Sequence, residues 1–311
     1  MIKHILITGA AGYIGHQLGN QLAVDSDVLG IDIRSNPQAD FPIEHRDIRD
    51  PKIGEFMKEA GITHVVHLAS VLQSSQDPER DYDIDVNGTQ NLLEACIDAG
   101  VRHLTVTSSG AAYGYHPDNP PWIDENDPLR GNQEFPYAYH KRLVEQLLAS
   151  YRDKHPELEQ LIFRPGTVLG AHTRNQITGL FLAHRVLRLR GSDSPFVFIW
   201  DQDVIRAMKQ GIRQDQSGIF NMAGDGALTI REIADKLGKP VITLPVPLVR
   251  AGLRIARLMG RPVGPEQVNF LRYRPVLDNR RLKEEFGYQP DKTSAQVLEY
   301  FIKHARLAGD L

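Results

Sequence analysis

The chain has 311 residues, of which 41% are hydrophobic and 24% are charged, a balance typical of a globular protein with a large core. Lys and Arg number 36 against 39 Asp and Glu, and this net charge of −3 disfavours nucleic acid or an acidic membrane as the main partner. Cys96 is the only cysteine, which excludes an internal disulfide and a cysteine-based metal site. We expect Cys96 to be a buried helix residue rather than a reactive thiol, and we expect no metal.

The first predicted element is a strand at 3–9, an apolar run far shorter than the roughly 20 residues of a membrane span. No cleavable small-residue site follows it, so we expect a cytoplasmic protein without a membrane partner. Further strands are predicted at 27–32, 64–70, 103–109 and 158–166, alternating with helices at 13–24, 80–99 and 136–154. Strand, helix and strand at this spacing predict an α/β fold, a doubly wound parallel sheet with helices on both faces.

The regular alternation loosens after about residue 165. A helix is predicted at 179–191, a strand at 195–200, a helix at 201–213 and a returning strand at 218–224. Short helices and proline-rich links are predicted for the remaining 225–311. We therefore expect a first domain of residues 1–165, to which 195–224 return, and a smaller C-terminal α/β substrate domain of 166–194 and 225–311.

Four arginines recur at helical spacing in the C-terminal part: Arg250, Arg254, Arg257 and Arg261. Such a row is typical of a helix face that binds a membrane surface or an anion, or of a solvated face. The negative total charge favours the solvated face.

Glycines at 9, 12 and 15 directly follow the first strand and open the first helix, in the sequence TGAAGYIG. Without side chains, the backbone can turn tightly and approach a pyrophosphate, and the helix N-terminus offers N–H groups to the anion. Tight packing of the helix on the strand is the alternative reason for such glycines. The order of strand, glycines and helix favours a dinucleotide-binding turn of the Rossmann type, which includes Tyr13 and Ile14.

Asp32 ends the second strand, seventeen residues beyond Gly15. A carboxylate at this position can accept hydrogen bonds from ribose hydroxyls and repels a 2′-phosphate, which favours NAD over NADP. Arg34 is the residue that could instead pair with a 2′-phosphate. Asp47, after a short third strand, suits the adenine amine, and capping of a following helix is the rival role, better suited to Asp50.

Tyr137 and Lys141 lie four residues apart in the helix predicted at 136–154, so they share a face, whereas Tyr139 points elsewhere. Free tyrosine has a pKa near ~10 and is a poor base at neutral pH, but a nearby ammonium favours the phenolate. Such pairs are common by chance. A third element supports chemistry here, because TSSGAAYG (107–114) follows a strand at the sheet edge where ligands of α/β folds gather. A serine there can stabilise charge on a substrate oxygen.

Together these features resemble an extended short-chain dehydrogenase/reductase of the NAD-dependent epimerase/dehydratase family. The matching motifs are TGAAGYIG, RDIRD, HLAS, DVNGTQNLLEA, TSSGAAYG, PYAYHKRLVE and RPGTVLG. The resemblance implies that Tyr137 is the acid/base, Lys141 its partner and Ser109, rather than Ser108, the donor to the substrate oxygen. It also implies a homodimer formed through the helices around 80–99 and 136–154.

The same resemblance implies a set of cofactor-binding residues. Leu68, Ala69 and Ser70 are expected to line the cofactor, Asn87 to support the strand ends, and the segment from Pro165 to Val168 to run past the nicotinamide. The full expected set is Gly9, Gly12, Tyr13, Ile14, Gly15, Asp32, Arg34, Asp47, Ile48, Leu68, Ala69, Ser70, Asn87, Thr107, Tyr137, Lys141, Pro165 and Val168.

Several departures from the family bear on the substrate. Thr167 stands where sugar-nucleotide epimerases usually carry Asn, and RGSDSPFVFIW lacks the arginine that would grip a nucleotide diphosphate. Trp200 replaces a usual histidine. Gly110 and Ala111 replace the acidic pair of 4,6-dehydratases, which disfavours dehydration.

The leading hypothesis is an NAD-dependent oxidoreductase that transfers hydride at a hydroxyl or carbonyl of a sugar-like or small alcohol substrate. The alternative is a (nucleotide-)sugar epimerase that recycles tightly bound NAD. A non-catalytic dinucleotide sensor is a third hypothesis, disfavoured because both Tyr137 and Lys141 are present.

Overall fold

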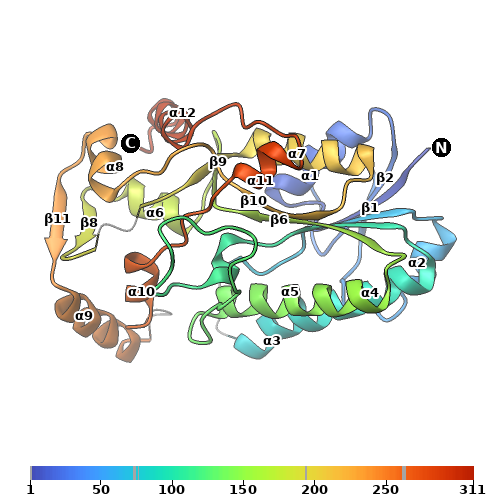
Figure 1. Cartoon of the computed structure of the whole chain (residues 1–311), viewed down its shortest axis with the longest axis horizontal. Coiled ribbons are helices and arrows are strands. Elements are labelled where there is room, and N and C mark those ends of the chain that lie inside the picture. Colours follow the sequence, from blue (N-terminus) through green and yellow to red (C-terminus); the bar gives the residue numbers. More distant parts are fainter. Residues whose placement is uncertain (1, 73–74, 76, 193–194, 261–263) are drawn as a thin grey trace. The chain divides into compact units, whose positions relative to one another are not determined.

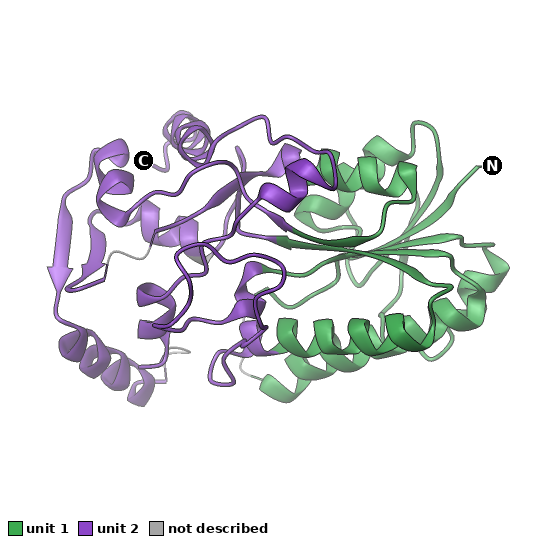
Figure 2. Ribbon diagram, viewed as in Figure 1, with its two compact units in different colours: residues 1–109, 140–164, 204–220 green, residues 110–139, 165–203, 221–311 purple. Residues whose placement is uncertain are grey.

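The computed structural model of the protein describes residues 2–72, 75, 77–192, 195–260 and 264–311, so Arg261 lies outside the described residues. The chain divides into two compact units (Figure 2). Unit 1 comprises Met1–Ser109, His140–Arg164 and Val204–Phe220, and unit 2 comprises Gly110–Tyr139, Pro165–Asp203 and Asn221–Leu311.

These boundaries differ from the expected domains chiefly in three segments, of which the shortest, 221–224, belongs to unit 2. Residues 110–139 belong to unit 2, where Ile123 forms a bridge with Leu277. Residues 195–203 also belong to unit 2, because the strand at 198–200 pairs with a neighbour in that unit rather than with the large sheet. The differences at 110–139 and 195–203 come from pairings between segments distant in sequence, which local patterns do not encode.

Unit 1 is built around a seven-stranded sheet (Figure 1). The order of its strands is β10-β6-β5-β4-β1-β2-β3. Its strands are β1 (His4–Thr8), β2 (Asp27–Asp32), β3 (Ile43–His45), β4 (His64–His67), β5 (His103–Thr107), β6 (Glu159–Pro165) and β10 (Gly218–Met222). The five pairs from β6 to β3 are parallel. The chain runs outward from β1 in both directions, which confirms the predicted doubly wound parallel sheet.

Helices cover both faces of this sheet (Figure 1). On one face lie α2 (Ile53–Glu59), α4 (Gly88–Ala99) and α5 (Pro136–Lys154), and on the other lie α1 (Tyr13–Leu22) and α7 (Asp201–Gln214). The bounds of α5 agree with those predicted from the sequence. Gly100 ends α4 in the left-handed conformation, at φ 69°, which glycine adopts without a steric penalty.

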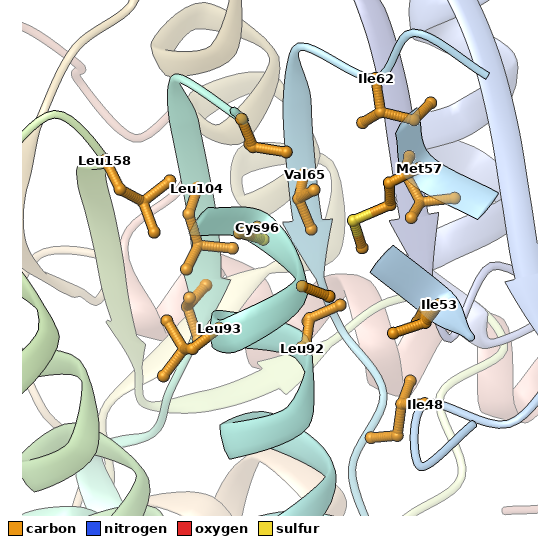
Figure 3. Close-up of a cluster of buried hydrophobic side chains, with 14 of the residues drawn as sticks. Ile48, Ile53, Met57, Ile62, Val65, Leu92, Leu93, Cys96, Leu104 and Leu158 are labelled. Carbon is orange, nitrogen blue, oxygen red and sulfur yellow. The ribbon is translucent and has the colours of Figure 1, made fainter. Parts of the chain in front are cut away.

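The apolar core beneath α2 and α4 explains why the strands read as nearly continuous hydrophobic runs (Figure 3). Met57 of α2 and Leu92 of α4 pack there with Val65 of β4 and Leu104 of β5. Cys96 is fully buried in the same cluster, and burial raises the pKa of its thiol to about 12. This confirms the prediction of a buried helix cysteine.

The helix predicted at 80–99 is interrupted. It consists of α3 (Pro78–Tyr82), a π-helical turn η1 (Asp83–Asn87) and α4. A π turn inserts one extra residue into the helical repeat and so rotates the residues that follow. Gly88 then lies against the core, where a Cβ atom would be 2.7 Å from Cδ1 of Ile48.

Two small parallel pairs organise unit 2: β7 (Thr167–Leu169) with β9 (Phe198–Trp200), and β8 (Val186–Leu189) with β11 (Val241–Leu244). The helix predicted at 179–191 was therefore wrong in its second half. Only α6 (Gln176–Leu182) is helical, and β8 follows because the distant β11 provides its hydrogen-bonding partner.

The remaining elements of unit 2 are helical: η2 (Gly110–Tyr113), α8 (Ile230–Leu237), α9 (Val246–Leu258), α10 (Gln267–Arg272), α11 (Arg280–Glu284) and α12 (Ser294–Leu307). Capping boxes begin α8 at Thr229 and α12 at Thr293, because each threonine side chain and a residue three positions later bond reciprocally. The core of unit 2 includes Phe196, Phe198 and Phe301. Within the described residues, no helix has the length and apolar character needed to cross a bilayer.

Candidate cofactor and catalytic site

The glycine turn after β1 has no room for side chains at two positions. Gly9 has a φ of +68°, and a Cβ atom there would be 2.7 Å from the backbone nitrogen of Ala69. A Cβ atom on Gly15 would be 2.3 Å from the carbonyl oxygen of Gly9. Gly12 is the N-cap of α1 and provides no side-chain cap, and Tyr13 and Ile14 begin the helix. The turn therefore presents bare backbone at a helix N-terminus, which fits a pyrophosphate.

Asp32 is buried at the end of β2 and is bound to the glycine turn. Its Oδ2 accepts a hydrogen bond from the backbone N–H of Ala11 at 3.0 Å, and its Oδ1 accepts one from the N–H of Arg34 at 3.0 Å. The Arg34 guanidinium is largely exposed, with its Nε 3.7 Å from Oδ1 of Asp32. The carboxylate is thus held next to the turn, at a position where ribose hydroxyls can donate to it.

Asp47 lies in an ion-pair network at the next strand end. Arg49 pairs with Asp47 at 2.6 Å and with Asp83 at 2.8 Å, and its hydrogen bonds hold the pKa of Asp47 below its ordinary value. The rival residue Asp50 is not the N-cap of α2, which is Lys52, but its Oδ1 accepts a hydrogen bond from the N–H of Lys52 at 2.9 Å. The side chain of Ile48 is buried in the core, so only its backbone can face a ligand.

The residues expected to line the cofactor after β4 are bound to β1. The backbone N–H of Leu68 donates to the carbonyl of Thr8 at 3.2 Å, and that of Ala69 donates to the Thr8 hydroxyl at 3.3 Å. The hydroxyl of Ser70 donates to Oδ1 of Asp85 at 3.1 Å. This segment therefore follows the carboxyl edge of the sheet beside the glycine turn.

The supporting role expected of Asn87 is not what the structure shows. Asn87 is exposed, and its side-chain amide donates to Asp83 at 2.9 Å within the helix. Because the π turn rotates the helix, Asp85 and Thr89 contact the strand ends instead. The sequence contained no signal for that rotation.

A buried acid and histidine lie beside Lys141, and neither was expected from the sequence. Nδ1 of His140 is 2.9 Å from Oδ2 of Asp85, and the N–H of Val71 donates to Oδ1 at 2.8 Å. Burial opposes ionisation, but the hydrogen bond from His140 and the charge of Lys141 hold the pKa of Asp85 below its ordinary value. The only available signal was that His140 directly precedes Lys141.

These groups border a cavity of about 10 Å³, close to the smallest volume that holds one water molecule. Ser70, Asp85, His140 and Lys141 contribute to its lining. Together with apolar neighbours, these four side chains give the cavity a partly polar lining.

His67 is fully buried between two threonines of the same region. Its Nδ1 is 2.8 Å from the hydroxyl of Thr8, and its Nε2 is 3.0 Å from the hydroxyl of Thr89. Burial, and then the charge of Lys141, lower the pKa of His67 to about 3. The imidazole is therefore neutral in the folded protein at ordinary pH.

Because His67 is buried and neutral, we expect the protein to lose stability in acid. Its pKa in the folded protein is below the value of about 6.5 in the unfolded chain, so falling pH protonates the unfolded state first. The contribution of His67 to the free energy of unfolding is complete above pH ~6.5 and declines as the pH falls toward 3. At pH 5 it is smaller by about 2 kcal/mol than at neutral pH. Urea unfolding of the wild type and of His67→Gln at pH 7 and pH 5 should show a smaller pH effect in the variant. An equal pH effect in both proteins would contradict this role.

The two serines after β5 have different surroundings. Ser108 is buried and donates to Glu145 at 2.5 Å, and Glu145 pairs with the buried Arg164 at 2.5 Å. Ser109 is half-buried and follows at the strand end. The hydroxyl of Ser108 is thus engaged by a buried carboxylate, and the role expected of Ser109 stays a prediction.

Helix α5 carries Tyr137 and Lys141 one turn apart. Lys141 is buried, and its ammonium donates to the carbonyl of Thr107, at the end of β5, at 3.2 Å. Tyr137 is half-buried and packs in an aromatic cluster of unit 2 with Tyr115 and Phe270. The division between the units passes through α5 after Tyr139.

The expected site residues are thus divided between the units. Unit 1 brings the glycine turn, Asp32, the segment from Leu68 to Ser70, Thr107 and Lys141 to the carboxyl edge of one sheet. Unit 2 carries Tyr137, Pro165 at the end of β6, and Val168 in β7.

Comparisons with known proteins agree with this geometry. The model of the NAD dependent epimerase/dehydratase family matches residues 5–223. A UDP-glucose 4-epimerase of Mycolicibacterium smegmatis is 30% identical, over 97% of this chain and 98% of that one. An N-acetyl-alpha-D-glucosaminyl-diphospho-ditrans,octacis-undecaprenol 4-epimerase of Escherichia coli O157:H7 is 26% identical, over 81% of this chain and 78% of that one. The solved structure of MoeE5 in complex with UDP-glucuronic acid and NAD has a TM-score of 0.76 at 23% identity, covering 98% of this chain and 99% of that one, and this likeness shows the fold.

Proposed function

Because the chain belongs to the NAD-dependent epimerase/dehydratase family, we propose that it transfers hydride between NAD and a hydroxyl-bearing carbon of a sugar-like substrate. The observation that carries this proposal is the placement of Lys141 by α5. Its buried ammonium is bound to the end of β5, and Tyr137 lies one turn earlier on the same helix. A tyrosine and lysine so arranged suit proton transfer to and from a substrate oxygen.

The chain's own residues divide the work as follows. Gly9 and Gly15 leave bare backbone for a pyrophosphate, and Asp32 accepts hydrogen bonds from ribose hydroxyls. Tyr137 removes the hydroxyl proton as the hydride leaves the substrate carbon, with Lys141 as its partner. Ser109 donates a hydrogen bond to the same substrate oxygen. NAD, when bound, accepts the hydride, and carbonyl reduction is the reverse reaction.

A second outcome of the same chemistry is epimerisation. It is supported by the relatives that act as 4-epimerases, one of them 30% identical over nearly the full length of both chains. In this outcome the oxidised substrate turns over and receives the hydride on its other face. The two relatives act on sugars with different diphosphate carriers, and Thr167 and Trp200 depart from the nucleotide-sugar pattern. We propose that the substrate is a sugar linked to a diphosphate carrier.

The two outcomes are separated by the fate of the hydride. We would denature freshly purified protein, identify any released dinucleotide by mass, and then incubate the protein with UDP-glucose and with UDP-galactose. Retained NAD and interconversion of the sugars without NADH in solution would establish epimerisation. Accumulation of NADH, followed by its absorbance, would establish dehydrogenation. Failure to bind NAD at all would contradict the proposed function.

Asp32→Ala is expected to weaken NAD binding by about 1–3 kcal/mol, or roughly 5- to 150-fold, because ribose hydroxyls lose a buried charged acceptor. The ratio of NAD affinity to NADP affinity should also be smaller in the variant, since the carboxylate no longer repels a 2′-phosphate. Titration calorimetry with both dinucleotides measures the two effects. Asp40→Asn, at an exposed acid, is the control and should bind NAD as the wild type does. Unchanged NAD affinity in Asp32→Ala would contradict the ribose assignment.

We further propose a cytoplasmic homodimer associated through α4 and α5, as the resemblance implies. Light scattering after size-exclusion chromatography measures the mass in solution. A monomer at micromolar concentration would contradict the proposed dimer.

A further inference from the structure

Helix α9 lies in the most basic part of the chain. Residues 236–265 contain six cationic side chains and no Asp or Glu, although the whole chain has a net charge of −3. Arg250, Arg254 and Arg257 are exposed along α9, and Arg257 forms an ion pair with Glu266. Positive charge is therefore concentrated on one surface element of unit 2.

The same helix, with its C-cap Met259, exposes four large apolar side chains. The exposed fractions are 58% for Leu248, 58% for Ile255, 88% for Leu258 and 75% for Met259. Leu248, Ile255 and Met259 lie at i, i+7 and i+11, so they form one face of the helix. None of the thirteen residues of α9 is buried.

A different face of α9 is turned toward the protein. Val246, Val249 and Leu253 are half-buried and lie on the side opposite the exposed row. The three arginines lie on one side between these two faces, with Arg254 nearest to Leu258 and Arg257 nearest to the half-buried residues. A solvated helix face accounts for the arginines but not for the three exposed large hydrophobic residues on one face, with Leu258 beside them.

We propose that α9 is an interfacial helix by which the protein binds the surface of a bilayer that contains anionic phospholipid. The exposed apolar row is of the kind that inserts at the boundary between headgroups and acyl chains, and an edge of arginines faces the headgroup phosphates in that orientation. The charge pattern favours this occupant over a second copy of the chain, because the arginines of α9 offer positive charge to the anionic headgroups. The inference is independent of the proposed function.

Vesicle co-sedimentation of the full chain tests the proposal. The wild type should bind vesicles of phosphatidylcholine with about one-third phosphatidylglycerol, and bind vesicles of phosphatidylcholine alone at least roughly ten-fold more weakly. The double substitution Arg250→Gln and Arg254→Gln should weaken vesicle binding about 25-fold, or about five-fold for each charge removed. Ile255→Glu should abolish sedimentation because it places a charge in the inserting row.

Matched controls are available elsewhere on the surface. Val24→Glu alters a valine that is 80% exposed in unit 1, and Arg231→Gln alters an exposed arginine of α8, so both should sediment as the wild type does. Leu258→Trp provides a second readout, because its fluorescence should shift to shorter wavelength only with anionic vesicles. NAD binding by all variants in solution should equal that of the wild type, which separates this test from one of the proposed function.

Three results would overturn the proposal. The first is absence of wild-type binding to the anionic vesicles. The second is binding by Ile255→Glu that equals the wild type. The third is a smaller oligomer in Ile255→Glu with unchanged vesicle binding, which would assign the exposed row to contact between copies of the chain.

Discussion

Tyr137→Phe is expected to lower kcat by about 10²- to 10⁴-fold while NAD affinity stays within two-fold, because the change removes a proton carrier and no phosphate contact. Tyr137 is half-buried, and its ring packs with Tyr115 and Phe270, so phenylalanine fits the same space. Steady-state kinetics with UDP-glucose measure kcat, and calorimetry with NAD measures the cofactor affinity.

Tyr139→Phe is the matched control for this experiment. Tyr139 is a half-buried tyrosine on the same helix, but it lies two residues from Tyr137 and so points to another side. It should retain the activity of the wild type. Equal activity in Tyr137→Phe and Tyr139→Phe would remove the catalytic assignment, whatever the cofactor affinity.

Glu145→Ala is expected to lower the free energy of unfolding by about 3–5 kcal/mol, because it leaves a buried arginine without its carboxylate. Glu145 accepts hydrogen bonds from Arg164 and from the hydroxyl of Ser108, and all three side chains are buried. Urea unfolding at neutral pH measures the change. Glu145→Gln should cost less, since its amide oxygen still accepts from Ser108.

Glu299→Ala is the control for burial. Glu299 pairs with Lys236 at 2.5 Å, but its side chain is 56% exposed, so the expected loss is below about 1 kcal/mol. Similar losses in Glu145→Ala and Glu299→Ala would show that the buried pair adds no more to stability than a surface pair does.

Sequence patterns predicted those parts of the fold that depend on local physics. The bounds of α5 and β2 agree with the prediction, because helical and strand periodicities are properties of neighbouring residues. The glycine turn was also predictable, since a tight turn between a strand and a helix requires residues without side chains. Cys96 was assigned correctly to the core because its neighbours in α4 form an apolar helix face.

Patterns failed where a partner distant in sequence decides the structure. The segment 186–189 has apolar residues that suit either a helix or a strand, and pairing with β11 makes it a strand. Residues 110–139 looked like part of the first domain, but they belong to unit 2. These outcomes depend on which segments meet in the folded chain.

The sequence by itself therefore determined the α/β class, the glycine turn after β1, Asp32 at the end of β2, and the one-turn separation of Tyr137 and Lys141. Only the tertiary structure decided which polar groups are buried around that lysine. Asp85, rather than Asn87, contacts the strand ends because a π turn rotates the helix, and His140 is buried against it. The physical reason is that periodicity encodes the spacing of residues along one element, whereas burial depends on the surfaces that other elements bring to it.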